Sequence, residues 1–346
     1  MISFQIRPEP TGGIATVPVS RTALDDNSLI PLYRTSTIAS LGDIQNPILP
    51  LDASCQSGNC TFLPYSSLAV CFKMHNVTDR LELTYIKNSK HADWTGGLGY
   101  FIEDPIRPAW NASLPNGVNF VTPLPYGSMV TTAKDPVNFG GDAVDNFSAL
   151  SYIFVIWTNT GNVTRAQLDD RRQPWRFGAV EILVHACVNT YTTTVISGNS
   201  HTDIISSSNM PSPVKDNWPL PLFYCQYIYD ESGWGQGCEK PNSTGGVQFS
   251  YFEDPSADDS PGKNRSTPLA FDHTLAAKLS LSVIESMDSL IVANDANRTD
   301  TTTVGLFPPG IIEALYTNKY ETRNWSDQFD GLSVFSTNLA VSYSNL

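Results

Sequence analysis

Apolar residues in the first three quarters of the chain follow the patterns of β-strands. Residues 80–87 (RLELTYIK) alternate apolar and polar positions, which is typical of a half-buried strand. Residues 150–158 (LSYIFVIWT) and 179–196 (AVEILVHACVNTYTTTVI) are apolar runs, and the second is rich in β-branched residues, so each predicts a buried strand. Residues 60–74 predict a further strand, and residues 1–50 predict extended chain interrupted by Pro and Gly.

The pattern changes after residue 268. Residues 272–291 fit a helix that Asp272 can cap, because apolar residues recur there at four-residue intervals. These are Leu275, Leu279, Val283 and Met287. Residues 310–318 and 325–343 also have a helical pattern. We therefore expect an α+β fold in which one domain spans residues 1–346, β-rich over 1–265 and helix-containing over 266–346.

Composition agrees with a globular chain and excludes two classes of partner. The chain has 346 residues, 41% hydrophobic and 16% charged, which is enough to bury a core. The net charge is −13, and no basic run offsets it. Because such a surface repels phosphate groups, nucleic acid is not expected as a partner, and neither is electrostatic docking on an anionic membrane.

Six cysteines allow three disulfides. They are Cys55, Cys60, Cys71, Cys187, Cys225 and Cys238. Six thiols permit 15 connectivities, so the count alone selects none. The alternative is six reduced core cysteines in a cytosolic protein. A zinc site is disfavoured because the chain has no CxxC or CxxH pair and its five histidines are scattered.

Asn-x-Ser/Thr acceptor patterns favour the secretory pathway. They occur at Asn59, Asn76, Asn111, Asn146, Asn162, Asn242, Asn264, Asn297 and Asn324, whereas chance would give roughly half as many. A bridged Cys60 would crowd Asn59, so N-linked glycans are expected at the other eight. With an even cysteine count, these patterns indicate an extracytoplasmic domain. The opening residues carry no signal-like apolar stretch, so we expect a piece of a longer protein whose targeting segment lies elsewhere.

Motifs for the common catalytic chemistries are missing. The sequence has no GxSxG, HExxH or GxxxxGK[ST] motif, and no GxGxxG follows a predicted strand. Asp295, Asn297 and Asp300 resemble part of a calcium loop, but the required glycine and final glutamate are absent. No cofactor and no metal are therefore expected.

Glu181, His185 and Tyr191 are the candidate polar groups of a binding pocket. Glu181 and His185 are four residues apart on a predicted strand, so they share a face at a separation of about 13 Å. A histidine in such a strand is a candidate general acid or base, because its surroundings can move its pKa across neutrality. Alternatively, neighbouring backbone satisfies both side chains. The many aromatic residues would suit an apolar small molecule.

Two cysteine-containing stretches resemble a family of fungal membrane-anchored proteins of unknown function. These are CQSGNCTFLPYSSLAVC (55–71) and RFGAVEILVHACVNTY (176–191). GGIATVPVSRTAL (12–24) and LSVFSTNLAVSYSN (332–345) are similar to the segments that flank the membrane helices of that family. The resemblance implies an extracytoplasmic domain tethered by membrane segments that this chain lacks. It implies no activity.

The resemblance also implies a disulfide pairing. The family carries two further cysteines at the positions of Met74 and Ile182, and the loss of both together is expected if they formed a bridge that an apolar contact replaces here. By extension we expect Cys71 to pair with Cys187. Cys55–Cys60 and Cys225–Cys238 would then be local bridges.

Three functions from different classes are compatible with these observations. The favoured one is a cofactor-independent enzyme of fungal secondary metabolism that acts on apolar terpenoid- or polyketide-like substrates, as a cyclase or a pericyclase such as a hetero-Diels–Alderase. The alternative is a non-catalytic glycosylated ectodomain that binds a ligand or partner. The third is a hydrolase with His185 or His273 as its base.

Overall fold

The protein is a β-rich, disulfide-containing chain, as the sequence predicts. The computed structural model describes residues 3–8, 14–19, 22–23, 53–89, 107–122, 127–133, 136–139, 148–159, 176–208, 224–230, 233–239, 249–252, 269–272, 289–293 and 301–305, together with Ser333 and Thr337. Strands in these ranges form five sheets, of which the largest has eight strands. The single-domain organisation stays a prediction.

The strands follow one another along the whole described chain. They are β1 (Ser3–Pro8), β2 (Ile14–Val19), β3 (Thr22–Ala23), β4 (Ser54–Cys55), β5 (Cys60–Thr61), β6 (Tyr65–Asn76), β7 (Glu82–Ser89), β8 (Arg107–Ser113), β9 (Asn119–Thr122), β10 (Gly127–Thr132), β11 (Ser148–Asn159), β12 (Arg176–Ile196), β13 (Asn199–Ser208), β14 (Tyr224–Asp230), β15 (Gly233–Glu239), β16 (Phe249–Phe252), β17 (Leu269–Asp272), β18 (Ser289–Ala293) and β19 (Thr301–Gly305). A short 3-10 helix, Thr78–Arg80, follows β6.

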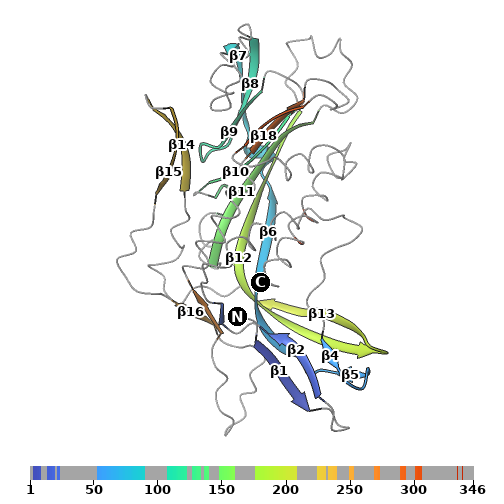
Figure 1. Ribbon diagram of the computed structural model, residues 1–346. Helices are drawn as coiled ribbons and strands as arrows, with labels where there is room; N and C mark the ends of the chain where they lie inside the picture. The colour runs from blue at the N-terminus through green and yellow to red at the C-terminus, as the bar shows by residue number, and fades with distance from the viewer. Residues whose placement is uncertain are drawn as a thin grey trace.

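Strand β12 is the centre of the largest sheet. It has 21 residues, and the order of the sheet is β13-β12-β11-β10-β18-β19, with β5 and β6 also paired to β12. Along one edge β12 pairs first with β11 and then with β13, and along the other it pairs first with β6 and then with β5. Figure 1 shows β12 running through the molecule before it turns into β13. All these pairings are antiparallel, so one strand fixes the register of four neighbours.

Both faces of β12 are buried over residues 177–189, which accounts for its nearly unbroken apolar sequence. One face packs against an upper core of twelve buried residues. They are Val77, Ala112, Leu114, Phe120, Phe139, Ala149, Tyr152, Phe154, Ile156, Phe177, Ala179 and Leu183. Burial of each large side chain stabilises the fold by about 1.5–3 kcal/mol. The small sheet β7-β8-β9 contributes Ala112 and Phe120 to this core.

A separate lower core lies near the other end of β12. It consists of Ala15, Ala53, Phe62, Tyr65 and Val195, with Cys55, Cys60 and Tyr191 packed against it. Ser197 and Gly198 form the two-residue turn between β12 and β13, and their φ values are 52° and 81°. Two-residue hairpin turns with positive φ at both positions favour glycine at the second one. Asn59 Oδ1 accepts the Ser197 N–H at 3.1 Å, and Gly58 O accepts the Gly198 N–H at 2.9 Å. The 55–60 turn therefore supports this hairpin.

Two of the three expected disulfides are confirmed. Cys55–Cys60 joins β4 to β5, so it links the β1-β2-β4 sheet to the largest sheet. Cys71–Cys187 joins β6 to β12 across 116 residues. A bridge that closes so long a loop stabilises the folded state by about 4–5 kcal/mol, because it reduces the conformational entropy of the unfolded chain. Cys225 and Cys238 face each other in register across β14 and β15, where a bridge between them stays a prediction.

The helices expected in the last third are not supported. Asp272, the expected cap, ends strand β17, and the end of the expected 272–291 helix is strand β18, in which Leu290 pairs with Met129 of β10. The sheet partner thus outweighs the local helical period. Residues 273–288 and 310–318 lie outside the described ranges. Of 325–343 the structure describes two helical residues, Ser333 and Thr337, and the Thr337 hydroxyl donates to the Ser333 carbonyl.

No helix within the described ranges is long and apolar enough to cross a membrane.

The register of β6 and β12 places Met74 directly opposite Ile182. Ile182 is fully buried and Met74 is half-buried. The two positions that the resemblance connects are therefore paired in the sheet.

We expect the double substitution Met74→Cys with Ile182→Cys to form an additional disulfide, because opposed Cβ atoms in an antiparallel pair lie about 4.5–5.5 Å apart. Mass spectrometry of non-reduced peptides would detect it. Met74→Cys with Val188→Cys is the control, since Val188 lies roughly 20 Å further along the strand. Free thiols in the first variant after oxidative refolding would contradict the register.

Candidate functional site

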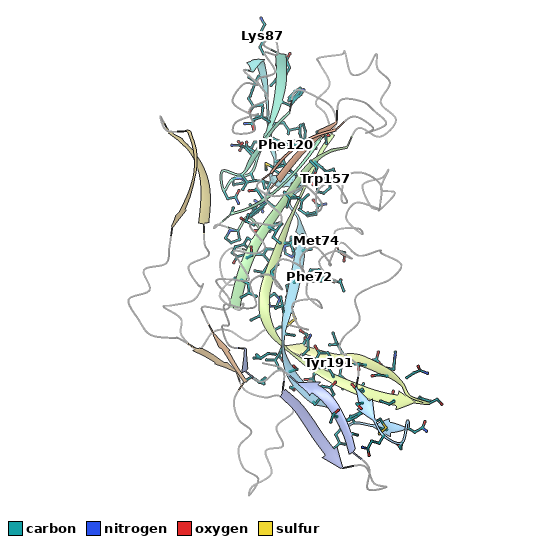
Figure 2. All side chains as sticks on the ribbon, viewed as in Figure 1. Phe72, Met74, Lys87, Phe120, Trp157 and Tyr191 are labelled. Carbon is teal, nitrogen blue, oxygen red and sulfur yellow. A yellow bond between two sulfur atoms is a disulfide. The ribbon has the colours of Figure 1, made fainter. Side chains whose placement is uncertain are left out.

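The structure places Glu181, His185 and Tyr191 on β12 but does not bring them together. The three positions differ by even numbers of residues, so their side chains lie on the same face of the strand. The rise per residue separates Glu181 from His185 by about 13 Å and His185 from Tyr191 by about 20 Å. Figure 2 shows Tyr191 far along β12 from Phe120 and Trp157. Each side chain therefore has its own surroundings.

Glu181 holds a loop against the sheet. Its side chain is fully buried, and its two carboxylate oxygens accept the N–H groups of Val137 at 2.7 Å and Asn138 at 2.8 Å. Phe139 of the same loop stacks on His75, whose Cα lies opposite Glu181, at a ring distance of 4.3 Å. Asn138 Nδ2 also donates to the Asn76 carbonyl at 3.4 Å. Glu181 is thus the main polar attachment of residues 136–139.

Burial raises the pKa of Glu181, and the hydrogen bonds from the backbone of Asn138, Val137 and Phe139 oppose that shift. The carboxyl group is therefore easier to protonate than an exposed glutamate. Its polar contacts agree with the alternative given above, in which neighbouring backbone satisfies the side chain.

His185 is neutral at physiological pH. Its side chain is 1% exposed, and burial lowers its pKa to about 4, opposed by a hydrogen bond to the Ala186 carbonyl and assisted by the charge of Lys73. Nδ1 lies 3.1 Å from that carbonyl, so the neutral ring carries its proton on Nδ1. A histidine with this pKa is a weak base.

Tyr191 belongs to a group of polar side chains that we call the tyrosine site: Tyr65, Asn189, Tyr191, Thr193 and Thr202. Tyr65 and Tyr191 are opposite each other in register, and their rings stack at 5.6 Å. Asn189 Nδ2 donates to Tyr191 Oη at 3.2 Å. Hydroxyl contacts of 2.9 Å link Tyr65 to Thr193 and Thr193 to Thr202.

The tyrosine site places hydroxyl groups beside apolar side chains. Burial raises the pKa of Tyr65, and it raises the pKa of Tyr191 as well, so both hydroxyls are protonated at neutral pH. Neither acts as a base in that state. Their rings pack against Phe62 and Val195 of the lower core. The arrangement suits a polarised oxygen on an otherwise apolar molecule.

Metal binding has no support in the described ranges. No three His, Cys, Asp or Glu side chains lie close enough together there to hold an ion. Among the described residues, the exposed pair His201–Asp203 forms an acid–histidine contact of 3.3 Å.

Glycan acceptors differ in exposure. Asn76 ends β6 and is exposed, whereas Asn111 is half-buried in β8, the middle strand of its sheet. The exposed Asn59 uses its Oδ1 to accept the Ser197 N–H. Asn146, Asn162, Asn242, Asn264, Asn297 and Asn324 lie outside the described residues, as does His273.

The sequence reasoning missed most of the tyrosine site. It selected Tyr191 but not Tyr65, Asn189 or Thr193, because nothing local marks them. One signal was present in the inferred contact of Met74 with Ile182. Tyr65 precedes Met74 by nine residues on β6, and Tyr191 follows Ile182 by nine residues on β12. In an antiparallel pair the same register therefore places Tyr65 opposite Tyr191.

Comparison with protein-family models, curated proteins and solved structures finds no match to this chain.

We expect Glu181→Gln to lower the free energy of unfolding by about 1–3 kcal/mol near pH 5. In the wild type both carboxyl oxygens accept a backbone N–H, whereas the amide NH2 of glutamine would place a donor against one of these N–H groups and leave it without an acceptor. The raised pKa means that the native state keeps the Glu181 proton more tightly, so the contribution of Glu181 to wild-type stability falls as pH rises above 4.5. The glutamine does not titrate. The difference between the two proteins should therefore shrink with rising pH in urea unfolding. Glu82→Gln, at an exposed position of β7, is the matched control. A difference that grows with pH would contradict this.

We expect His185 to contribute acid sensitivity. The unfolded histidine binds a proton near pH 6.5 and the folded one only near pH 4, so its contribution to stability is complete above pH 6.5 and is lost as pH falls to about 4. The loss is about 3 kcal/mol. His185→Gln should flatten this slope in denaturant unfolding, while His201→Gln, on the exposed strand β13, should retain it. Equal slopes in wild type and His185→Gln would refute the assignment.

Proposed function

We propose that this chain is a cofactor-independent enzyme of fungal secondary metabolism that acts on an apolar terpenoid- or polyketide-like substrate. The observation that carries the proposal is the tyrosine site, in which two stacked rings and their protonated hydroxyls adjoin the apolar lower core. The fungal setting rests on the resemblance of the cysteine stretches.

The reaction class is cyclisation or cycloaddition, such as a hetero-Diels–Alder step. In that step π electrons redistribute between two partners and no proton is transferred, so the protein need only hold the partners together and polarise a carbonyl. A tyrosine O–H can do so by donating a hydrogen bond to the carbonyl oxygen. The rings of Tyr65 and Tyr191 would orient the apolar part of the substrate. Glu181 and His185 would then support the scaffold and would not touch the substrate.

We place the enzyme in the secretory pathway. The disulfides Cys55–Cys60 and Cys71–Cys187 support an oxidising compartment, and exposed Asn76 supports N-linked glycosylation. We also propose that the protein is attached to a membrane, as the family resemblance implies.

We expect deletion of the gene to make its producing strain accumulate an uncyclised precursor, and purified protein to convert that precursor in the deletion extract. Mass spectrometry of the two extracts measures both effects. Tyr65→Phe combined with Tyr191→Phe should lower the conversion rate at least tenfold, since each change removes a donor but keeps the ring. Tyr85→Phe is the control, because Tyr85 lies on β7 in another sheet.

Unchanged extracts would refute the enzyme proposal and favour the second candidate, a non-catalytic glycosylated ectodomain. That candidate has its own support in β13, whose residues are all exposed or half-exposed. Two large apolar side chains of β13, Ile204 and Ile205, are exposed, as is Ile196 at the end of β12. Such a strand suits contact with a partner protein.

A further inference from the structure

The Cys71–Cys187 disulfide lies against a buried amide. Asn189 is two residues beyond Cys187 on the same face of β12, and its side chain is 6% exposed. Its Oδ1 lies 3.6 Å from Cys71 Sγ and 3.8 Å from Cys187 Sγ. The other end of the amide, Nδ2, donates to Tyr191 Oη. Asn189 therefore lies between the disulfide and the tyrosine site.

The chemistry of this contact depends on the state of the sulfurs. A bridged sulfur carries no hydrogen, so neither sulfur of the disulfide can donate to Asn189 Oδ1, whereas two thiols both can. Among the described residues nothing else donates to this oxygen. A buried acceptor without a donor is unfavourable. The orientation of the amide thus suits the reduced pair better than the oxidised pair.

Cys71 is the sulfur that a reductant can reach. Its residue is half-buried, while Cys187 is 1% exposed. The Ser207 hydroxyl of β13 lies 3.4 Å from Cys71 Sγ, where it can donate to a developing thiolate. His185 is directly opposite Cys71 in register and adjoins Cys187 on the same face. Polar groups of two strands, β12 and β13, thus lie beside this bridge.

We propose that Cys71–Cys187 is a thiol–disulfide exchange site for a dithiol reductant, and that Asn189 transmits its redox state to Tyr191. A thiolate of the reductant attacks Cys71 Sγ, which breaks the bridge and releases Cys187 as a thiolate that takes a proton. The second thiol of the reductant then attacks its own sulfur in the mixed disulfide and frees Cys71. Two electrons and two protons pass from the dithiol to the protein.

The redox state selects the orientation of the Asn189 amide. With two thiols, both S–H groups donate to Oδ1, and Nδ2 donates to Tyr191 Oη, which leaves the tyrosine proton available for a ligand. With the disulfide, Oδ1 faces two sulfurs that carry no hydrogen while Nδ2 donates to Tyr191 Oη, so this orientation exchanges with its half-turn, in which Nδ2 faces the sulfurs and Oδ1 accepts the Tyr191 proton. In the half-turned orientation Tyr191 is a donor to the protein itself. This inference needs no catalytic activity of the chain.

The test reduces the folded full-length chain with dithiothreitol and maps the new thiols by alkylation and mass spectrometry. We expect alkylation at Cys71 and Cys187 while the far-ultraviolet circular dichroism stays unchanged. Tyrosine titration by ultraviolet absorbance should then show a lower midpoint for one tyrosine in the reduced protein, because an N–H donated to Oη favours the phenolate.

Matched variants locate the effect. Tyr191→Phe should abolish the redox-dependent midpoint, and Tyr85→Phe should keep it. Asn189→Leu should still be reduced at Cys71 but should titrate alike in both states. The double variant Cys55→Ser with Cys60→Ser should keep the full response.

Three results would overturn the proposal. These are no alkylation of Cys71 in the folded protein at a dithiothreitol concentration that opens Cys55–Cys60, identical titrations in both redox states, or a redox response that survives in Asn189→Leu.

Discussion

A strand that is buried on both faces and paired on both edges has no access to water, and this constraint organises the molecule. Strand β12 satisfies it with apolar residues at most positions. Each of its polar side chains must find a partner inside the protein or lose its charge. Glu181 finds the backbone of residues 136–139, His185 stays neutral, and Asn189 finds Tyr191. The same constraint thus gives the strand its stability and creates the polar positions from which a site can be built.

The two ends of β12 use this constraint differently. At the upper core, the partner of Glu181 is a backbone loop, and the rings of Phe120 and Phe177 pack edge to face at 6.2 Å. At the lower core, the partners are hydroxyl and amide side chains, which leave donors beside aromatic rings. The hydrogen bonds of the Glu181 carboxylate hold a backbone loop against the sheet. The side-chain hydroxyls of the tyrosine site can instead exchange a protein partner for a ligand. This difference is the reason for our proposal that a ligand binds at the lower end, while the upper end contributes stability.

The sequence predicted those parts of the fold that depend on local pattern. The runs at 150–158 and 179–196 became β11 and β12, because an apolar segment of that composition must be buried wherever it lies. The helix expected over 272–291 failed at its ends, because the pairing of Leu290 with Met129 joins segments that no local pattern connects. The attachment of Glu181 to residues 136–139 could not be predicted either, because every residue except proline carries a backbone N–H and the donors therefore leave no mark in the sequence. The Cys71–Cys187 disulfide was expected from the resemblance alone, because sequence periodicity does not connect two strands that are far apart in the chain.

The long separation between β6 and β12 has a consequence for synthesis. Cys71 and Cys187 are 116 residues apart, so at about 5–20 residues per second the ribosome finishes β12 roughly 6 to 23 seconds after β6. Throughout that interval the nascent chain carries an apolar strand whose long-range partner does not yet exist. Cys55 and Cys60 can meet within that time, but Cys71 must wait, exposed to the wrong thiol. Successful biogenesis of this protein therefore depends on the cell shielding an unfinished sheet until its central strand emerges.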